Sequence, residues 1–333
     1  MSEGEFALIA RLVEAMPCRR EDVVLGPGDD AAVLRPPAGM DLVQTVDTCL
    51  EGVHFPAGMA AEDVGWRSLA VNLSDLAAMG AEPAWGLLSL ALPEPDERWL
   101  EAFTRGVRAA AAEAAMAPGF APGTAGERRA LALVGGDMVR GPLTVSFTLT
   151  GFVPRGTALS RAGAAPDDEV WVTGPLGGGA AGLSAWRRGD VGGAESFLRP
   201  RARVAEGGAL RGLASAAIDV SDGLAQDLGH LLDASGVGAV VTAEELPVHP
   251  LAASSEAWSE ALSMALNGGD DYQLCFTVPA QRRAALLAAA AGWREPPVRI
   301  GVIRPQPGLE LRSGGRAVPL PEGGWDHFKG QGT

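Results

Sequence analysis

The sequence predicts an α/β (α+β) protein of two domains, from its length and from the order of its apolar patterns. At 333 residues the chain is long enough for about two domains, each with a packed core. Hydrophobic residues make up 47% of it, which excludes a disordered or low-complexity protein. In the second half, strand-like and helix-like segments alternate, as in layered α/β domains. The segment 155–168 is the expected linker, so the domains are expected at 1–154 and 155–333.

The apolar spacing predicts alternating helices and strands in the first domain. Residues 5–16 have the apolar stripe of a short amphipathic helix, and a longer helix is expected at roughly 60–80. Asp96 is the expected cap of a third helix, whose sequence begins DERWLEAF. The expected strands are MDLVQTVD, which ends on Asp47, then WGLLSLALP, then LALVGGD, which is expected to run into a glycine turn, and then LTVSFTLTGFVP. The segment 117–129 is rich in proline and glycine and is expected to be a loop.

The second domain is expected to open with a strand, a glycine loop and a helix, in the stretch EVWVTGPLGGGAAGL. Further on, AIDVSDGLAQDLGHLL (217–232) is typical of a strand running into a helix, and it holds three aspartates. Isolated carboxylates are costly to bury and usually stay at the surface unless something pairs with them. Asp219 and Asp222 are therefore candidate site residues, whereas Asp227 is expected to be an ordinary helix residue.

The charge and the absence of targeting signals limit the classes of partner. A net charge of −14 argues against nucleic acid and against anionic membranes, because both are bound by basic surfaces. No stretch approaches the roughly 18 apolar residues that would span a bilayer. The acidic start MSEGEF lacks the basic region of a signal peptide. The three cysteines (Cys18, Cys49 and Cys275) are far apart, which indicates reduced thiols. These features predict a cytoplasmic protein.

Many aspartates share one setting, which is a glycine or small polar neighbour at the end of an apolar run. Strand ends and helix starts are where α/β proteins build their sites. Each aspartate alone has an ordinary explanation, such as an acidic turn or a helix start that favours negative charge. Asp75 is harder to explain in this way, because it falls within the apolar pattern of a helix. The set comprises Asp29, Asp30, Asp47, Asp75, Asp137, Asp219, Asp222, Asp270 and Asp271.

The ligand types favour magnesium. The chain has four histidines, and no pair of them has the spacing of a zinc site. Carboxylate oxygens without thiolate or imidazole partners suit Mg²⁺, with Mn²⁺ or Ca²⁺ as substitutes. Mg²⁺ usually takes one or two carboxylates together with substrate phosphates. So many carboxylates therefore indicate several Mg²⁺ ions that bridge phosphates, which is the chemistry of phosphoryl transfer.

The scarcity of lysine excludes two classes of ATP-binding protein. Lys329 is the only lysine, so the chain has no G-x-x-x-x-G-K-[ST] loop and no lysine near any glycine loop. A P-loop enzyme and a protein-kinase-like fold are both excluded on this ground. Metal ions, backbone amides and arginines would have to neutralise the phosphates of ATP. Arg161, in the stretch SRAG, is the best-placed arginine, although a solvent-exposed linker arginine explains it equally well.

Together these motifs resemble the thiamine-monophosphate kinase family of the AIR-synthase-like superfamily. The resemblance covers almost the whole chain, and its most specific motifs are VNLSDLAAMGA, SDGL, GGDDYQLC and the closing DHF. It implies a two-domain AIR-synthase-like fold with a C-terminal α/β domain. The small sheet of the N-terminal domain would pair with that of a second chain to close a barrel in a homodimer. The active site would then lie in a cleft near that interface.

The resemblance also implies a reaction, in which ATP transfers its γ-phosphoryl group to thiamine monophosphate to give thiamine diphosphate and ADP. The transfer would be direct and in line, on clustered Mg²⁺ ions and without a phosphoenzyme. Both substrates carry several negative charges that repel at close range, so clustered cations would hold them together. A phosphate oxygen is already an adequate nucleophile, which agrees with the lack of a convincing catalytic histidine.

Residue roles carry over at the positions that match the family's motifs. The metal-ligand positions correspond to Asp30, Thr45, Asp47, Asp75, Asp137, Asp219 and Asp222. The ATP-binding positions correspond to Gly136, Asp137, Arg161 and Ser221, and the thiamine-monophosphate positions to His54, Asp270 and Trp325. The expected catalytic residues are Asp30, Asp47, Asp75 and Asp219, and Asp29 is expected to support the metal group.

Several departures from the family's pattern leave two alternatives open. Val46 and Met138 stand where hydroxyl residues are usual, Asp270 is one methylene shorter than usual, and the loop 117–129 looks longer. One alternative is an aminoimidazole ribotide synthase, against which SDLAAMGA and the terminal WDHF count. The other is an acidic, dimeric metal- or nucleotide-binding protein without activity, which Val46 and Met138 keep open.

Overall fold

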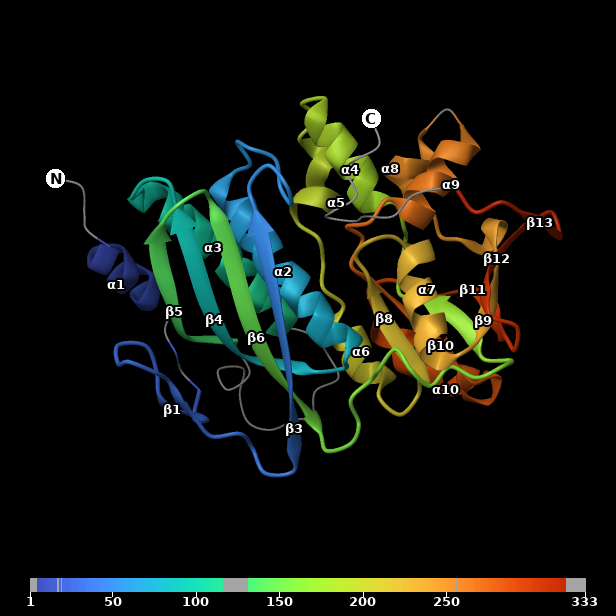
Figure 1. The fold of residues 1–333 in the computed structure, drawn as a ribbon, viewed down its shortest axis with the longest axis horizontal. Coiled ribbons are helices and arrows are strands. Elements are labelled where there is room, and N and C mark those ends of the chain that lie inside the picture. Colours follow the sequence, from blue (N-terminus) through green and yellow to red (C-terminus); the bar gives the residue numbers. More distant parts are fainter. Residues whose placement is uncertain (1–4, 17, 19, 116–130, 256, 322–333) are drawn as a thin grey trace. The chain divides into compact units, whose positions relative to one another are not determined.

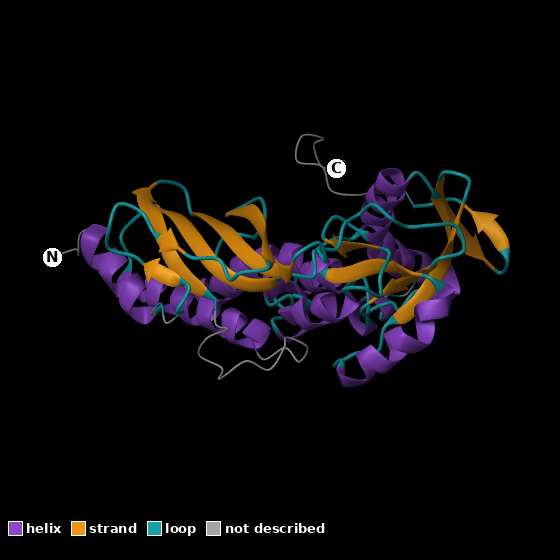
Figure 2. Cartoon of the chain, turned by 90° about the horizontal axis from the view of Figure 1, so that it is seen from below, coloured by secondary structure: helices purple, strands orange, loops and turns teal. Residues whose placement is uncertain are grey.

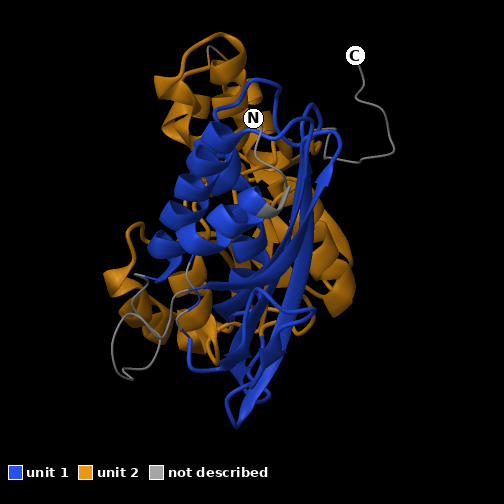
Figure 3. Cartoon of the chain, turned by 90° about the vertical axis from the view of Figure 1, so that its left-hand side faces the viewer, with its two compact units in different colours: residues 1–158 blue, residues 159–333 orange. Residues whose placement is uncertain are grey.

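The computed structural model describes residues 5–16, 18, 20–115, 131–255 and 257–321. The chain forms two compact units, Met1–Ala158 and Leu159–Thr333, which Figure 3 draws in different colours. Both units mix helices with sheets, and this confirms the expected α/β (α+β) class (Figure 1). Within the described ranges, no helix is long and apolar enough to cross a membrane.

The first unit is built on a four-stranded sheet and a separate two-stranded ribbon. The strands are β1 (Val23–Leu25), β2 (Val33–Leu34), β3 (Met40–Leu50), β4 (Glu82–Leu92), β5 (Ala132–Arg140) and β6 (Thr144–Pro154). The order in the sheet is β3-β6-β4-β5, and β1 pairs with β2 in the ribbon. β6 runs antiparallel to both of its neighbours, whereas β4 and β5 are parallel. β3 and β5 are therefore the two edges of the sheet.

Helices cover one face of this sheet (Figure 2). They are α2 (Ala61–Ala78) and α3 (Glu97–Ala115), whereas α1 (Glu5–Ala15) packs against α3 and the edge strand β5. α2 packs against β3, β4 and β6, and α3 packs against α2. Gly65 and Gly106 permit this close crossing, because a Cβ at Gly106 would lie 1.8 Å from the carbonyl oxygen of Glu62. A carboxylate oxygen of Asp96 accepts the backbone N–H of Trp99 at 3.0 Å, which confirms Asp96 as the cap of α3.

Two details of the first unit differ from the expectation. The strand that holds Asp47 runs on to Leu50, so Asp47 lies inside β3 and not at its end. Gly135 and Gly136 lie within β5, where a glycine turn was expected. The reason is steric: a Cβ at Gly136 would lie 1.9 Å from the carbonyl oxygen of Leu88, so glycine is needed for close strand packing.

The second unit contains a seven-stranded sheet in the order β13-β12-β9-β11-β7-β10-β8. Its strands are β7 (Glu169–Val172), β8 (Ala216–Val220), β9 (Gly238–Thr242), β10 (Gln273–Val278), β11 (Val298–Arg304), β12 (Gly308–Ser313) and β13 (Arg316–Val318). Neighbouring strands are antiparallel except for β12 and β9. Strands and helices alternate along the chain, as the sequence predicts.

The helices of the second unit pack around this sheet. They are α4 (Gly178–Arg187), α5 (Glu195–Leu198), α6 (Val204–Leu210), α7 (Leu224–Ser235), α8 (Pro250–Ala253), α9 (Trp258–Asn267) and α10 (Arg283–Ala289), with 3₁₀ turns η2 (Gly192–Ala194), η3 (Ala243–Glu245), η4 (Ala280–Arg282) and η5 (Ala290–Gly292). α7 contributes most to the core, because Leu224, Leu228 and Leu231 are fully buried against the strands. Cys275 lies in the same core, and all three cysteines are free thiols, as expected.

Candidate active site

Three of the predicted metal ligands come together where β3 passes over α2. The hydroxyl of Thr45 donates a hydrogen bond to Oδ2 of Asp75, which joins the strand to the helix. Asp47 lies two residues further along β3 and therefore on the same face of the strand as Thr45. Its backbone N–H donates to Oδ1 of Asn72 at 2.9 Å. Because Asn72 and Asp75 are three residues apart on α2, one face of the helix holds both against the strand.

Hydrogen bonds fix the orientation of the Asn72 amide on α2 and of the His54 ring, which lies just beyond β3. Asn72 is fully buried, and its Nδ2 donates to the carbonyl oxygen of Ser68 at 3.0 Å, which leaves Oδ1 for Asp47. We did not predict Asn72, because an asparagine inside a helix gives no sign of its partner. His54 lies just beyond β3, and its Nδ1 accepts the N–H of Leu50 at 3.0 Å. Nε2 is therefore the ring atom that carries the proton in the neutral imidazole.

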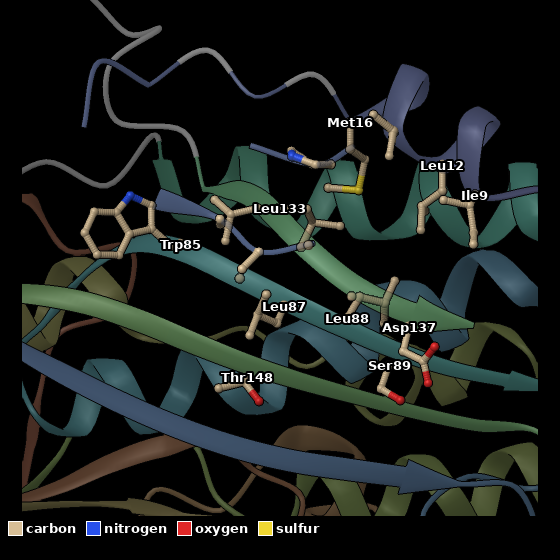
Figure 4. Close-up of a pocket in the computed structure, with 18 of the residues that line it drawn as sticks. Ile9, Leu12, Met16, Trp85, Leu87, Leu88, Ser89, Leu133, Asp137 and Thr148 are labelled. Carbon is tan, nitrogen blue, oxygen red and sulfur yellow. The ribbon is translucent and has the colours of Figure 1, made fainter. Parts of the chain in front are cut away.

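A pocket of about 1240 Å³ lies on the other face of the sheet (Figure 4). Four predicted residues line it, namely Asp29, Asp30, Gly136 and Asp137. Asp137 lies beside Ser89, its register partner on β4. Part of the pocket wall is apolar, with Leu12 from α1, Met16 directly after it, and Leu87 from β4. The pocket thus joins a carboxylate group to an apolar surface large enough for a heterocyclic ring.

The GDD segment that carries Asp30 is anchored to the sheet through Asp22. Oδ1 of Asp22 accepts Nε1–H of Trp85 on β4 at 2.9 Å, and the Arg20 guanidinium donates to both carboxylate oxygens. The backbone carbonyl of Asp22 accepts the N–H of Arg35 at 2.8 Å, which closes the segment between them into a loop. Inside this loop, the N–H of Asp30 donates to Oδ1 of Asp29 at 2.9 Å.

Val46 and Met138 stand where the family usually has hydroxyl residues. Both side chains point away from the neighbouring carboxylates. Val46 alternates with Asp47 along β3, and its side chain is 62% exposed on the open face of the sheet. Met138 alternates with Asp137 along β5 and is buried, with 5% of its surface exposed. Neither substitution therefore removes a side-chain oxygen from the face of the strand on which the adjacent aspartate lies.

The two carboxylate groups of the first unit lie at opposite edges of the sheet. The register aligns Asp47 on β3 with Gly136 on β5, across the two intervening strands. Three inter-strand spacings of about 4.8 Å separate these edges by roughly 14 Å. Among the residues that the structure describes, no three His, Cys, Asp or Glu side chains lie close enough together to hold a metal ion. Within one chain, the predicted ligands of this unit therefore form two groups.

In the second unit, the end of β8 and the loop that follows it carry three predicted site residues. Asp219 is buried near the end of β8, and Ser221 and Asp222 follow directly. Oδ2 of Asp227 accepts the backbone N–H groups of Ser221 and Asp222, both at 3.0 Å. The expectation that Asp227 is an ordinary helix residue is therefore wrong, because its buried carboxylate holds the loop. Burial raises the pKa of Asp227 to about 7.

The structure brings the predicted acceptor residue Asp270 next to the predicted ATP residue Ser221. The backbone N–H of Asp270 donates to the carbonyl oxygen of Ser221 at 2.8 Å. The Tyr272 hydroxyl donates to Oδ1 of Asp270 at 2.9 Å and orients its carboxylate. The loops 220–223 and 267–272 are thus hydrogen-bonded into one site. Sequence motifs named both loops, but their contact depends on the sheet order.

Arg161 does not join this group. The carbonyl oxygen of Ser160 accepts the N–H of Ala217 at the start of β8, whereas Ser221 follows the end of that strand. A five-residue strand is roughly 13 to 16 Å long, so the backbones of Arg161 and Ser221 are about that far apart. The Ser235 hydroxyl donates to the carbonyl oxygen of Arg161 at 3.0 Å and fixes its backbone at the C-terminal end of α7.

Two of the expected features lie outside the described residues. One is Trp325, the predicted aromatic contact of thiamine monophosphate, and the other is the loop 117–129. Their roles stay predictions.

Comparison with known proteins identifies the family. Two family models match the chain: AIR synthase related protein, N-terminal domain, over residues 28–153, and AIR synthase related protein, C-terminal domain, over residues 165–314. A thiamine-monophosphate kinase of Salmonella typhimurium is 42% identical over 337 residues, which cover 98% of this chain and 99% of the relative. This chain belongs to the thiamine-monophosphate kinase family. The thiamine-monophosphate kinase of Bacillus subtilis is 34% identical and covers 92% of the chain and 94% of its own length.

Solved structures of the family share this fold. The crystal structure of thiamine-monophosphate kinase from Stenotrophomonas maltophilia K279a superposes with a TM-score of 0.81 at 44% identity, and covers 96% of this chain and 99% of its own. AaThiL complexed with AMPPCP and TMP gives a TM-score of 0.72 at 29% identity, with 98% and 97% coverage. The hydrogenase maturation protein HypE of E. coli, at 20% identity and a TM-score of 0.73, shows the fold alone. These matches confirm the expected two-domain AIR-synthase-like fold.

Proposed function

We propose that this chain is an ATP-dependent kinase that phosphorylates thiamine monophosphate to thiamine diphosphate and releases ADP. The observation that carries the proposal is the 42% identity to thiamine-monophosphate kinases over nearly the whole chain. A family member complexed with AMPPCP and TMP gives further support, because it holds a nucleotide analogue and TMP together. The similarity to bacterial thiamine-monophosphate kinases leads us to place the enzyme in the cytoplasm.

In the proposed reaction, an oxygen of the thiamine-monophosphate phosphate attacks the γ-phosphorus of ATP in line. A bond forms between that oxygen and the γ-phosphorus, the bond to the β,γ-bridging oxygen breaks, and ADP leaves with the electron pair. The nucleophile is already an anion, so no strong base and no phosphoenzyme are needed. His54 and Asp270, with Trp325, are the proposed acceptor contacts, and Ser221, Gly136 and Arg161 the nucleotide contacts.

Mg²⁺ is the proposed metal, and the donor chemistry fits it. The oxygen donors Thr45, Asp47 and Asp75 lie in one group, Asp30 and Asp137 line one pocket, and Asp219 and Asp222 lie at the end of β8 and in the loop after it. Each group offers the one or two carboxylates that Mg²⁺ usually takes from protein, beside hydroxyl or water oxygens. Bound Mg²⁺ would neutralise the negative charge on the phosphates of both substrates. The carboxylates of the chain hold and space the cations.

A homodimer would bring together the two sheet edges of the first unit that carry predicted site residues. The open face of the four-stranded sheet exposes the apolar side chains of Leu42, Val46, Leu87 and Val139. Exposed apolar side chains gathered on one face of a sheet are typical of an interface. In a barrel closed by a two-fold axis along its length, β5 of one chain would lie beside β3 of the other. The edges that carry Asp137 of one chain and Asp47 of the second would then lie side by side, with Asp137 on the open face and Asp47 on the face that α2 covers.

Binding calorimetry tests the identity of the acceptor. With Mg²⁺ and a non-hydrolysable ATP analogue present, the protein should bind thiamine monophosphate with a dissociation constant in the micromolar range that is common for enzyme substrates. An aminoimidazole ribotide synthase would bind the nucleotide analogue but not thiamine monophosphate. A protein that binds only metal would bind neither, and either of these results would reject the proposal.

A further inference from the structure

The stretch GPLGGGAAGL has the form of a phosphate cradle, since glycines connect the end of β7 to the start of α4. Free N–H groups at such a helix start commonly bind phosphate. Here the position is already filled by the chain. Oδ2 of Asp271 accepts the N–H of Gly177 at 2.7 Å, and Oδ1 accepts the N–H of Gly179 at 3.1 Å. Asp271 is buried, so the loop binds an internal carboxylate instead of a ligand phosphate.

The glycines of this loop are required by the close approach of residues 270 and 271. Gly177 has φ of 84°, in the left-handed region that favours glycine. A Cβ at Gly179 would lie 2.5 Å from the carbonyl oxygen of Asp270. These two glycines therefore let the start of α4 pack directly onto the backbone of the loop 267–272. Because this loop carries Asp270, a proposed contact of thiamine monophosphate, it is called the acceptor loop.

The acceptor loop has an unusual backbone that must be held in place. Gly269, Asp270 and Tyr272 have φ values of 64°, 60° and 49°. Residues other than glycine rarely adopt this left-handed conformation, and they keep it only where the surroundings fix it. One side of the loop is bonded to the end of β8, through the N–H groups of Asp270 and Tyr272. The carboxylate of Asp271 bonds the loop to α4 on the other side.

We propose that Asp271 is a positioning residue for the acceptor: its clamp on Gly177 and Gly179 holds the left-handed backbone that presents Asp270 to thiamine monophosphate. This inference rests on the proposed function. Asp227 uses the same device for the nucleotide, since its carboxylate accepts the two N–H groups of the Ser221 loop. The unit therefore contains two matched carboxylate clamps, one behind each substrate's loop.

The two clamps predict opposite kinetic effects for the same chemical change. In Asp271→Asn, an NH₂ group would face an N–H donor in place of a carboxylate oxygen, and one bond of the clamp would be lost. The KM for thiamine monophosphate should rise about tenfold or more, while the KM for MgATP stays within about twofold of wild type. In Asp227→Asn, the KM for MgATP should rise by a similar factor, with the KM for the acceptor little changed.

Two further variants separate positioning from a general loss of stability. Glu169→Gln alters a buried carboxylate at the far end of β7, where Glu169 pairs with Arg283 and Arg299, and should lower the Tm without moving either KM. Asp271→Glu keeps both carboxylate oxygens that accept hydrogen bonds. It should therefore raise the KM for thiamine monophosphate less than Asp271→Asn does. If Asp271→Asn does not fold, the kinetics of Asp271→Glu test the positioning role of Asp271 instead.

The test combines these kinetics with hydrogen–deuterium exchange of residues 267–273. We expect exchange at 267–273 to be faster in Asp271→Asn and unchanged in Glu169→Gln. We also expect Asp271→Asn to raise the KM for thiamine monophosphate and Asp227→Asn to raise the KM for MgATP. Unchanged acceptor KM in both Asp271 variants, or equal rises in both KM values, would overturn the proposal. Unaltered exchange at 267–273 would also overturn it, because the clamp would then hold nothing. Wild-type protein that makes no thiamine diphosphate would instead reject the proposed function, and exchange would still decide whether the clamp exists.

Discussion

Asp75→Asn should lower kcat/KM for thiamine diphosphate formation by about 10³-fold, which corresponds to about 4 kcal/mol of lost transition-state stabilisation. The physical reason is loss of one negative charge from the group formed by Thr45, Asp47 and Asp75, which is proposed to hold a cation between two phosphate chains. Steady-state kinetics at saturating Mg²⁺ measures the effect. The hydroxyl of Thr45 points to Asp75, so Thr45→Val should show a smaller loss of about tenfold.

Asp63→Asn is the matched control for Asp75→Asn. Asp63 lies in the first turn of the same helix, and the substitution changes the same atoms. It should retain wild-type activity within about twofold, because roughly 18 Å of helix separates it from Asp75. A folded Asp75→Asn protein with more than a tenth of wild-type activity would contradict the assignment of Asp75 to the reacting centre.

A mixture of two inactive variants should recover activity if the active site is shared between chains. Asp47→Asn and Asp137→Asn change opposite edges of the sheet, roughly 14 Å apart within one chain. When the two variants are co-assembled in equal amounts, half of the dimers are mixed, and each mixed dimer has one intact site of two. About a quarter of wild-type activity should therefore return. Specific activity of the purified mixture, with dimer content from sedimentation, measures this.

The control for this experiment is a mixture of Asp47→Asn with Asp75→Asn. Both residues belong to the β3–α2 group of one chain, so no mixed dimer would contain an intact site, and no activity should return. Failure of the Asp47→Asn and Asp137→Asn mixture to recover activity would reject the shared site, and so would equal recovery in both mixtures.

The sequence predicted the elements better than it predicted their partners. Helix periodicity and the Asp96 cap located α3, and the alternating pattern located β6, because these signals are local. The motifs named both Asp270 and Ser221 as site residues, and the structure joins their backbones by a hydrogen bond of 2.8 Å. Strand order is a non-local property. No local pattern therefore showed that β3 and β5, which carry Asp47 and Asp137, are opposite edges of one sheet.

Side chains that bind backbone groups were the residues most often misread. Asp227 and Asp271 each accept two N–H groups, and the partners depend on loop geometry that composition does not reveal. Asn72 was missed for the same reason, since its amide bonds the backbone of a neighbouring strand. Gly136 was read as part of a turn, although its missing Cβ serves strand packing. For Asp271, Asn72 and Gly136 the signal lies in a contact distant in sequence, and for Asp227 it lies in the conformation of the loop just before its helix.

Turnover with γ-labelled ATP is the most direct test of the central claim. Purified protein is incubated with Mg²⁺, labelled ATP and thiamine monophosphate, and the products are separated by chromatography. The account predicts thiamine diphosphate that carries the label, formed in equal amounts with ADP, and no product when Mg²⁺ is chelated. Label that appears as inorganic phosphate, with thiamine monophosphate unchanged, would contradict it.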